Sequence, residues 1–327
     1  MSKRRRVMEL VYFAFVLILV LAMLYSLSKV LFNLVYDAPE RQEHPSKTVI
    51  KDGVAYFPRQ DVTVVLVMGI DQYGKAVESG SYNNHGAADM VMLMIFDDLR
   101  EVCDILYLNR DTMLKMPVLG VGGKPAGYYY GQLALSHTYG AGMKDSCENT
   151  RQAVSDFLMG IQIDYYVAMN MDAISILTDA VDGVTVEVTE DFSQVDPSIG
   201  MGLVTLRGEQ AINYVRTRKD VGDQLNLSRI ERQKAFVESF SKAFAEKQNA
   251  STTFFTTTYE SVSDYLVTDC TGTSLNALYQ RYSKYTLGAV YTLEGENVMG
   301  EKYFEFYADE QKLESLTLQL FYAPKKS

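Results

Sequence analysis

A basic segment at 207–234 carries the residue types best suited to binding phosphate. It holds seven Lys or Arg in 28 residues, within a chain of net charge −10. Arg216 and Arg218 stand at the end of one predicted helix, while Arg229 and Arg232 stand three apart in the first turn of the next. Cations at a helix start oppose the helix dipole, whereas its free N–H groups favour an anion. The segment therefore predicts a phosphate site. A solvated patch whose arginines pair with neighbouring acids is the alternative.

Two carboxylates flank predicted strands and are candidates for a metal site. Asp71 follows the apolar run 62–68, and Asp89 precedes the apolar run 90–96. A short connection leads to a third run, 102–108, which predicts that the second and third strands pair antiparallel. Asp71 and Asp89 are then expected at one end of the sheet. Two carboxylates can hold Mg²⁺ when phosphate oxygens fill the rest of its shell. For each acid, a turn or loop cap is the alternative.

The rest of the chain alternates predicted strands with predicted helices, which indicates an α/β fold with a mixed sheet covered on both faces. Capping residues mark helix starts at Ser146, Asp172 and Ser228, the last as a capping box with Glu231. The further predicted strands are 163–171, 183–188, 288–293 and 302–307, the predicted helices are 146–159, 172–180, 208–217 and 228–247 with a closing helix from Asp309, and 294–297 is a predicted turn.

The N-terminal residues predict a membrane anchor. Basic residues at 3–6 precede an uncharged stretch at 10–28, and the apolar character continues to residue 36. This length can span a bilayer, and the basic flank places the N-terminus in the cytoplasm. A cleaved signal peptide is the alternative, but no small-x-small cleavage site follows. The predicted organisation is a cytoplasmic tail at 1–6, a transmembrane helix at 7–36, an extracellular stalk at 37–60 and a catalytic domain at 61–327.

The charge outside the anchor argues against nucleic acid as a partner. Residues 1–36 hold five of the 31 basic and one of the 41 acidic residues, which leaves 26 and 40 and a net charge near −14. Such a surface repels polyanions, so the basic segment suggests a pocket for one defined anion. Three cysteines are too few for a disulfide framework, and the pairing of Cys147 with Cys270 is left open. The three histidines have no zinc-like spacing with cysteine.

An ordered set of short motifs resembles the LytR-CpsA-Psr family, also called cell-envelope-related transcriptional attenuators. The resemblance spans residues 62–240 and lies behind a single anchor. The motifs are Gly69-Ile70-Asp71, Ala88-Asp89, Asn109-Arg110-Asp111-Thr112, Gly183-Val184, Leu206-Arg207-Gly208-Glu209-Gln210-Ala211, Arg216-x-Arg218 and Arg229-x-x-Arg232-Gln233. The resemblance implies an α/β/α sandwich with an apolar pocket for a polyprenyl chain. It also implies transfer of a glycopolymer from polyprenyl pyrophosphate to peptidoglycan, at the outer face of the cell membrane.

The resemblance also implies roles for individual residues. Asp71 and Asp89 would hold Mg²⁺. The implied catalytic residues are Arg110, Arg216, Arg218 and Asp223, and the implied pyrophosphate ligands are Arg229, Arg232 and Gln233. The candidates for lining a lipid tunnel, each of which could equally be plain core, are Leu133, Phe157, Leu158, Ile174, Leu177, Phe236 and Phe240.

Two arginines of the family pattern are absent from this sequence. Tyr73 and Ala87 stand in their places, with Lys75, Asn83 and Asn84 as candidate substitutes. A binding protein without turnover, or a pyrophosphatase acting on the same lipid, is therefore the alternative to a transferase. Direct control of transcription is improbable, because the predicted cytoplasmic tail is too short to bind DNA.

Overall fold

The computed structural model describes residues 48–217, 219–222 and 226–325. Among these residues, no helix is both long and apolar enough to cross a membrane. The predicted tail and anchor lie outside the described residues, as do Arg218 and Asp223.

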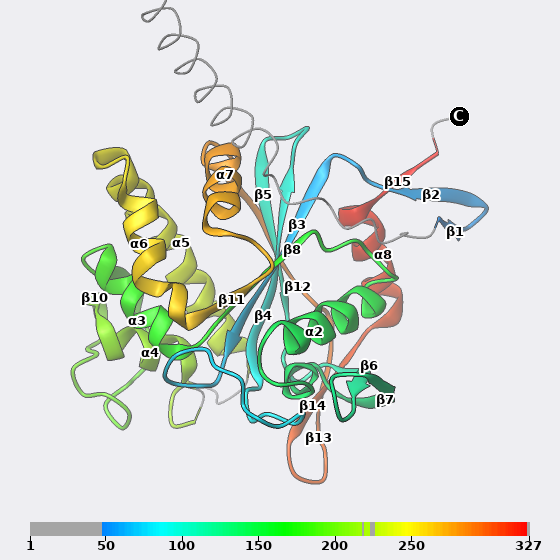
Figure 1. Cartoon of the computed structure of the whole chain (residues 1–327), viewed down its shortest axis with the longest axis horizontal. Helices are drawn as coiled ribbons and strands as arrows, with labels where there is room; N and C mark the ends of the chain where they lie inside the picture. Colours follow the sequence, from blue (N-terminus) through cyan, green and yellow to red (C-terminus); the bar gives the residue numbers. More distant parts are fainter. Residues whose placement is uncertain (1–47, 218, 223–225, 326–327) are drawn as a thin grey trace, which may run out of the picture.

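A six-stranded mixed sheet forms the centre of the molecule (Figure 1). β3 runs parallel to β8, and β5 parallel to β12, whereas β3–β4, β4–β5 and β8–β11 pair antiparallel. The predicted α/β fold with a mixed sheet is confirmed, as is the antiparallel pairing of the second and third predicted strands. In spatial order the strands are β11 (Leu266–Thr268), β8 (Tyr165–Met169), β3 (Val62–Ile70), β4 (Ala88–Asp97), β5 (Val102–Leu108) and β12 (Thr286–Thr292).

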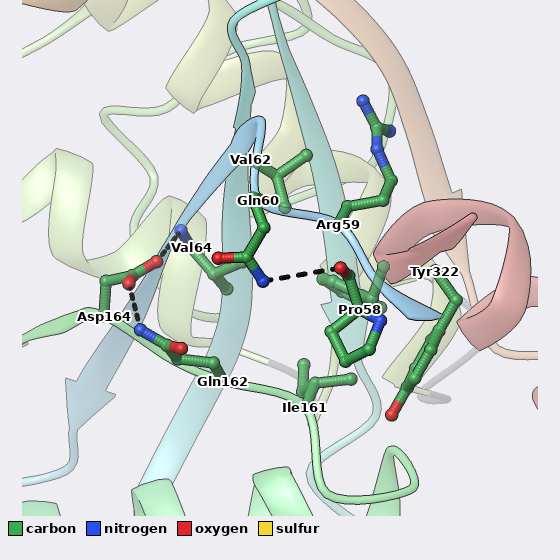
Figure 2. Close-up of a pocket in the computed structure, with 10 residues that line it drawn as sticks. Pro58, Arg59, Gln60, Val62, Val64, Ile161, Gln162, Asp164 and Tyr322 are labelled. Atoms are coloured by element: carbon green, nitrogen blue, oxygen red, sulfur yellow. Dashed lines mark hydrogen bonds between the residues drawn. The ribbon is translucent and has the colours of Figure 1, made fainter. Parts of the chain in front are cut away.

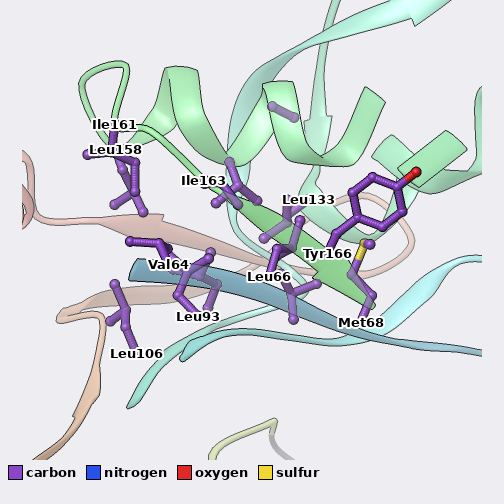
Figure 3. Packing of buried hydrophobic residues seen from close by; sticks show 14 of the residues in the cluster. Val64, Leu66, Met68, Leu93, Leu106, Leu133, Leu158, Ile161, Ile163 and Tyr166 are labelled. Carbon is purple, nitrogen blue, oxygen red and sulfur yellow. The ribbon is translucent and has the colours of Figure 1, made fainter. Parts of the chain in front are cut away.

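Alternate residues of β3 face two different layers. Val64, Leu66 and Met68 belong to the main core, with side chains from α2 and η1 (Figure 3). Val65 and Val67 face the other way, towards α5. Full burial of a side chain such as Leu66 stabilises the fold by about 1.5–3 kcal/mol.

The helices that surround the sheets are η1 (Leu133–Thr138), α2 (Lys144–Phe157), α3 (Met171–Ala180), α4 (Gly208–Arg216), α5 (Asn226–Ala250), α6 (Phe254–Val262), η2 (Ser263–Tyr265), α7 (Gly272–Tyr282) and α8 (Glu310–Phe321).

Four smaller sheets surround the centre. β1 and β2 fall within the predicted stalk, yet β2 pairs with β15 near the C-terminus, so residues 49–58 belong to the folded domain.

The β6–β7 hairpin was not predicted, because its Gly- and Tyr-rich second strand lacks apolar alternation. The predicted turn at 294–297 is wrong, since residues from Gly295 pair with β14. The remaining bounds are β1 (Val49–Lys51), β2 (Val54–Pro58), β6 (Met113–Leu119), β7 (Pro125–Gln132), β9 (Val184–Val188), β10 (Gly202–Leu206), β13 (Gly295–Met299), β14 (Phe304–Ala308) and β15 (Tyr322–Pro324).

Three predicted helix starts are corrected by the structure. Ser146 lies buried inside α2, where its hydroxyl donates to the Tyr139 carbonyl at 2.9 Å. The cap of α3 is Asn170, which accepts from Ala173 N, and not Asp172. Ser228 lies inside α5, which already begins at residue 226. Short polar side chains near a helix start compete for the cap, and spacing alone does not select among them. The predicted start of the closing helix at Asp309 is confirmed, and Asp309 caps it by accepting from the amides of Gln311 and Lys312.

The three cysteines, Cys103, Cys147 and Cys270, are buried and free. Burial raises the pKa of Cys103 and Cys270 to about 12, so both thiols stay protonated at neutral pH. The question left open for Cys147 and Cys270 is settled: they do not form a disulfide.

The end of the sheet where β3 begins is closed by polar contacts. Asp164 accepts from the Val64 amide at 2.8 Å, which pins the start of β3 beside the start of β8. The adjoining hollow between Gln60, Ile161 and Tyr322 measures about 20 Å³ (Figure 2). That volume has room for about one water. This end of the sheet is therefore structural.

A buried carboxylate organises the β4–β5 turn at the same end. Asp97 is fully buried and accepts from Arg59 at 2.8 Å and from Arg100 at 2.7 Å. Its other oxygen accepts from the Leu99 and Arg100 amides, both at 3.0 Å. Burial by itself raises the pKa of Asp97, but the bonds from Arg100 and Arg59 outweigh it and lower the pKa to about 2.

We expect this carboxylate to make the protein sensitive to acid. A depressed pKa contributes stability that is present above about pH 4 and is lost as the pH falls towards 2. A pKa of about 2 against 3.8 corresponds to about 2 kcal/mol of unfolding free energy. Urea unfolding at pH 6, 3 and 2 should show this loss in the native protein. The Asp97→Asn variant should lack it, and Asp98→Asn, at the neighbouring, partly exposed position that pairs with Arg281, should retain it. Equal pH slopes for all three proteins would contradict the assignment.

Candidate functional site

The opposite end of the sheet gathers the predicted charged residues. β3 ends one residue before Asp71, β4 begins one residue before Asp89, and β5 ends two residues before Arg110. Because β4 is antiparallel to both neighbours, these three ends meet. The Asp71 amide donates to the Ala87 carbonyl at 3.0 Å, so Asp71 lies beside the segment that leads into Asp89, at the same end of the sheet.

Asp71 pairs with Arg216 at the end of α4. Arg216 Nε donates to Asp71 Oδ1 at 2.9 Å, and Nη2 donates to Oδ2 at 3.3 Å. The hydrogen bond to Asp71 raises the pKa of Arg216 against the effect of burial, and the charges of Asp71 and Asp89 act in the same direction. The Arg216 side chain is 43% exposed, so a ligand can reach it. Two-point pairing is the geometry by which arginine also recognises phosphate.

Asp89 lies between two arginines. Arg110 donates to its Oδ1, and Arg229 in the first turns of α5 contacts its Oδ2 at 3.4 Å and its backbone carbonyl at 3.2 Å. The β3–β4 ladder skips Asp89: Gly69 pairs with Met90, and Ile70 with Ala88. Such a bulge re-aims a side chain. Arg229 is buried, so its observed role is to hold Asp89.

Arg232 and Gln233 are directed at α4. Arg232 is buried and donates to the carbonyls of Tyr214, at 3.0 Å, and Thr217, and it pairs with Glu190. Gln233 donates to the Val215 carbonyl at 3.1 Å. These carbonyls lie in the last turn of α4 and just beyond it, where helices leave acceptors unsatisfied. The geometry supports a positioning role for both side chains, because they fix the turn that carries Arg216; the predicted contact of Arg232 and Gln233 with pyrophosphate stays a prediction.

Two of the three candidate substitutes for the missing arginines, Lys75 and Asn84, are bound to partners outside the site. Lys75 is exposed and pairs with Asp264 at 2.7 Å. Asn84 is buried and donates to the carbonyls of His137 and Gly140 at 2.9 and 3.1 Å. Tyr73 is 54% exposed, and its pKa is raised by burial while the charge of Arg216 opposes the shift. A tyrosine therefore stands beside Arg216 where the family pattern has a cation.

The apolar surface nearest this site differs from the predicted tunnel. Leu133 and Leu158 are fully buried in the core on the α2 face of the sheet, where they pack as ordinary core residues. Ile174, Phe236 and Phe240 belong to a separate cluster between the helices. The apolar cluster that continues from Asp89 lies between the sheet and α5. Its buried members are Val67, Met92, Ile105, Tyr107 and Ile230, and its partly buried members are Val65, Met90, Met94, Met169 and Val237.

This methionine-rich cluster was missed because β4 reads as one continuous apolar run. Its alternation places Met90, Met92 and Met94 on the α5 face, whereas Val91, Leu93 and Ile95 join the main core. Methionine adapts to irregular apolar partners. The Tyr107 hydroxyl, buried here, has no hydrogen-bond partner among the described residues.

The carboxylates fit a metal only in part. Asp71 and Asp89 lie at one sheet end, with side chains 33% and 13% exposed. Across the described ranges, no group of three or more His, Cys, Asp or Glu is arranged to hold a metal. Mg²⁺ commonly takes one or two carboxylates and completes its shell with water and phosphate oxygens. The donor set therefore fits Mg²⁺ that arrives with a phosphorylated ligand.

Comparison with known proteins finds similarity to proteins named teichoic acid transferases. It is 28% identical over 178 residues to the polyisoprenyl-teichoic acid–peptidoglycan teichoic acid transferase TagU of Bacillus subtilis, covering 54% of this chain and 51% of that one. The chain thus spans about half the length of this relative. With TagU of Bacillus licheniformis the identity is 23%, over 85% of this chain and 83% of that one.

Solved structures agree on the fold. The structure described as TagT bound to LI-WTA superposes with a TM-score of 0.60 at 21% identity, covering 80% of this chain and 90% of that one. Likeness at this identity concerns the fold alone. The sequence pattern of the LytR_cpsA_psr family matches residues 33–321, which is most of the chain. The chain therefore belongs to the LytR_cpsA_psr family.

Proposed function

We propose that this protein transfers a glycopolymer from a polyprenyl-pyrophosphate carrier to peptidoglycan. The observation that carries the proposal is the cluster of Arg216, Arg110, Asp71 and Asp89 at one sheet end, beside an apolar cluster beneath α5. Charged donors and an apolar face are the two features that a lipid pyrophosphate requires. Family membership and the names of the relatives support the same assignment.

In the proposed reaction, a sugar hydroxyl of the acceptor attacks the sugar-linked phosphorus of the donor. The new oxygen–phosphorus bond forms as the bond to the bridging oxygen breaks, and polyprenyl phosphate leaves with that electron pair. The hydroxyl proton passes to a base. Asp223 is the predicted base, and it lies outside the described residues. Mg²⁺, held by Asp71 and Asp89, would neutralise charge on the phosphate oxygens.

Arg216 is the arginine best placed to act on the pyrophosphate. It is the more exposed of the two candidate donors, with Arg110 at 21%. Its bond to Asp71 holds the guanidinium in place before the donor arrives, and preorganised donors contribute most to phosphoryl transfer. Residues 7–36 would hold the domain at the outer membrane face, where the polyprenyl carrier and peptidoglycan meet.

The first test measures transfer in the Arg216→Ala variant. We expect the rate to fall by about 100-fold, because one preorganised donor is lost. The assay supplies a polyprenyl-pyrophosphate oligosaccharide, Mg²⁺ and peptidoglycan oligomers, with mass spectrometry of the phosphodiester-linked conjugate. Lys75→Ala is the control, since it removes an exposed cation outside the site. Release of polyprenyl phosphate without conjugate would instead identify a pyrophosphatase. Undiminished transfer by Arg216→Ala would refute the assigned site.

The second test concerns the metal. We expect EDTA to abolish transfer and added Mg²⁺ to restore it. Asp89→Asn and Asp71→Asn should each raise the Mg²⁺ concentration needed for half-maximal rate by about tenfold or more, because a neutral amide oxygen is a weaker ligand than a carboxylate. Asp264→Asn, which changes an exposed carboxylate outside the site, should leave that concentration unchanged. Full activity in EDTA would remove the metal from the proposal.

The non-catalytic binder is the second candidate, and Tyr73 is the observation that favours it. A Tyr73→Arg variant adds a cation beside Arg216, and we expect donor affinity to rise by about tenfold at low ionic strength. Tyr82→Arg, a change in the same loop away from Arg216, is the control. The comparison is made by titrating donor lipid into each variant. If both variants gain donor affinity equally, the gain comes from the added positive charge alone, and position 73 has no special role.

A further inference from the structure

An open hollow of about 570 Å³ lies beside the Arg110 loop. Its walls are the β6–β7 hairpin, the end of α2, β14 and the start of α8, which lie together at the lower right of Figure 1. None of the predicted catalytic, pyrophosphate-binding or metal-binding residues lines it, but Phe157, a candidate for lining the predicted lipid tunnel, does. The hollow is large enough for a small ligand or a few units of a polymer.

Tyrosine rings dominate the hollow. Tyr128 and Tyr130 project from the same face of β7 and are 63% and 55% exposed, and Tyr307 of β14 is 40% exposed. Tyr129, between the first two, is 49% exposed and does not line the hollow. Each ring offers an apolar face and a hydroxyl, and exposed aromatic groups gathered around one concavity mark a binding surface. Sugar rings, with C–H faces and hydroxyl edges, match such a lining.

The charges around the hollow argue against an anionic ligand. Lys115 is the one cation among the lining residues, and it lies 4.3 Å from the centre of the Tyr128 ring. Asp156 and Glu310 are also part of the lining. One positive and two negative groups would repel a polymer with repeated phosphates. A neutral saccharide chain avoids that repulsion.

The walls of the hollow are joined to the loop that carries Arg110. β6 begins three residues after Arg110, and the Asp111 carbonyl accepts from the Phe306 amide of β14 at 2.9 Å. Gln132 at the end of β7 donates to the Phe304 carbonyl at 2.7 Å. These bonds fix the walls to the arginine loop. Lys115 lies five positions after Arg110, and Arg110 and Asp111 form a turn before β6 begins, so the two residues are at most about 18 Å apart.

We propose that this hollow binds the phosphate-free saccharide chain of the acceptor and delivers its hydroxyl to the Arg110 loop. The assignment rests on the proposed function, since it gives that transferase its acceptor site. The apolar cluster beneath α5 would then bind the lipid of the donor. The hollow lined by tyrosines would bind the glycan of the acceptor.

The test titrates chitohexaose, an uncharged oligomer of N-acetylglucosamine, into the full-length chain by calorimetry. Removal of both rings in Tyr128→Ala/Tyr130→Ala should weaken binding by about tenfold or more. Tyr129→Ala, on the other face of the same strand, should leave binding unchanged. Arg216→Ala should also bind normally, because it affects only the pyrophosphate site. In the transfer assay, the double variant should raise the acceptor KM about tenfold, with kcat and the donor KM unchanged.

Several outcomes would overturn this proposal without touching the transferase assignment. They are failure of the native chain to bind chitohexaose at millimolar concentration, equal loss in Tyr129→Ala and the double variant, and preference for poly(glycerol phosphate) over chitohexaose. Conversely, glycan binding that depends on Tyr128 and Tyr130 in a protein that makes no conjugate would support the hollow and refute the proposed transfer. Matched melting temperatures exclude misfolding as the cause of any loss.

Discussion

The arrangement of the candidate site depends on the bulge that takes Asp89 out of the β3–β4 ladder. Without it, the strict alternation of β4 would place Asp89 on the same face as Val91 and Leu93, in the main core. With it, Asp89 meets Arg110 from β5 and Arg229 from α5. A carboxylate with so little exposure requires such partners, because an unpaired buried charge is strongly unfavourable. The bulge therefore depends on the arginines that pair with Asp89, and the arginines reach Asp89 only because the bulge turns it towards them.

α5 connects the parts that the proposed reaction needs. Its first turns hold Asp89 through Arg229, and one turn later Arg232 and Gln233 hold the end of α4. The same helix packs Ile230 and Val237 on the methionine-rich face of the sheet. A displacement of α5 would consequently alter the position of Arg216 and the apolar cluster together. If the protein has the proposed function, a lipid that enters beneath α5 would shift the positions of the arginines through these direct contacts.

The sequence predicted those elements of the structure that have a recognisable local pattern of residues. Continuous apolar runs located β3, β4 and β5, and the short connections between them gave their pairing and the proximity of Asp71 to Asp89. The direction of a buried side chain is set by packing and was not predictable: Arg232 reads as a phosphate ligand by its spacing but satisfies helix carbonyls. The β6–β7 hairpin was missed because tyrosines and glycines carry no alternation. The catalytic, metal-binding and pyrophosphate-binding roles of the candidate residues all stay predictions, and Arg218 and Asp223 also lie outside the described residues.

The two ends of the sheet differ in how exposed their carboxylates are, and this difference supports the choice of the Asp71 end as the candidate site. Asp97 is fully buried, with both oxygens bound to nearby donors, so little is left for a ligand. Asp71 is bound to an equally polar partner, but its side chain is 33% exposed and that of Arg216 is 43% exposed. An exposed pair gains little net stability, because water screens it. A phosphate and a cation can therefore replace the Asp71–Arg216 contact at small energetic cost, whereas the same exchange at Asp97 would require the β4–β5 turn to unfold.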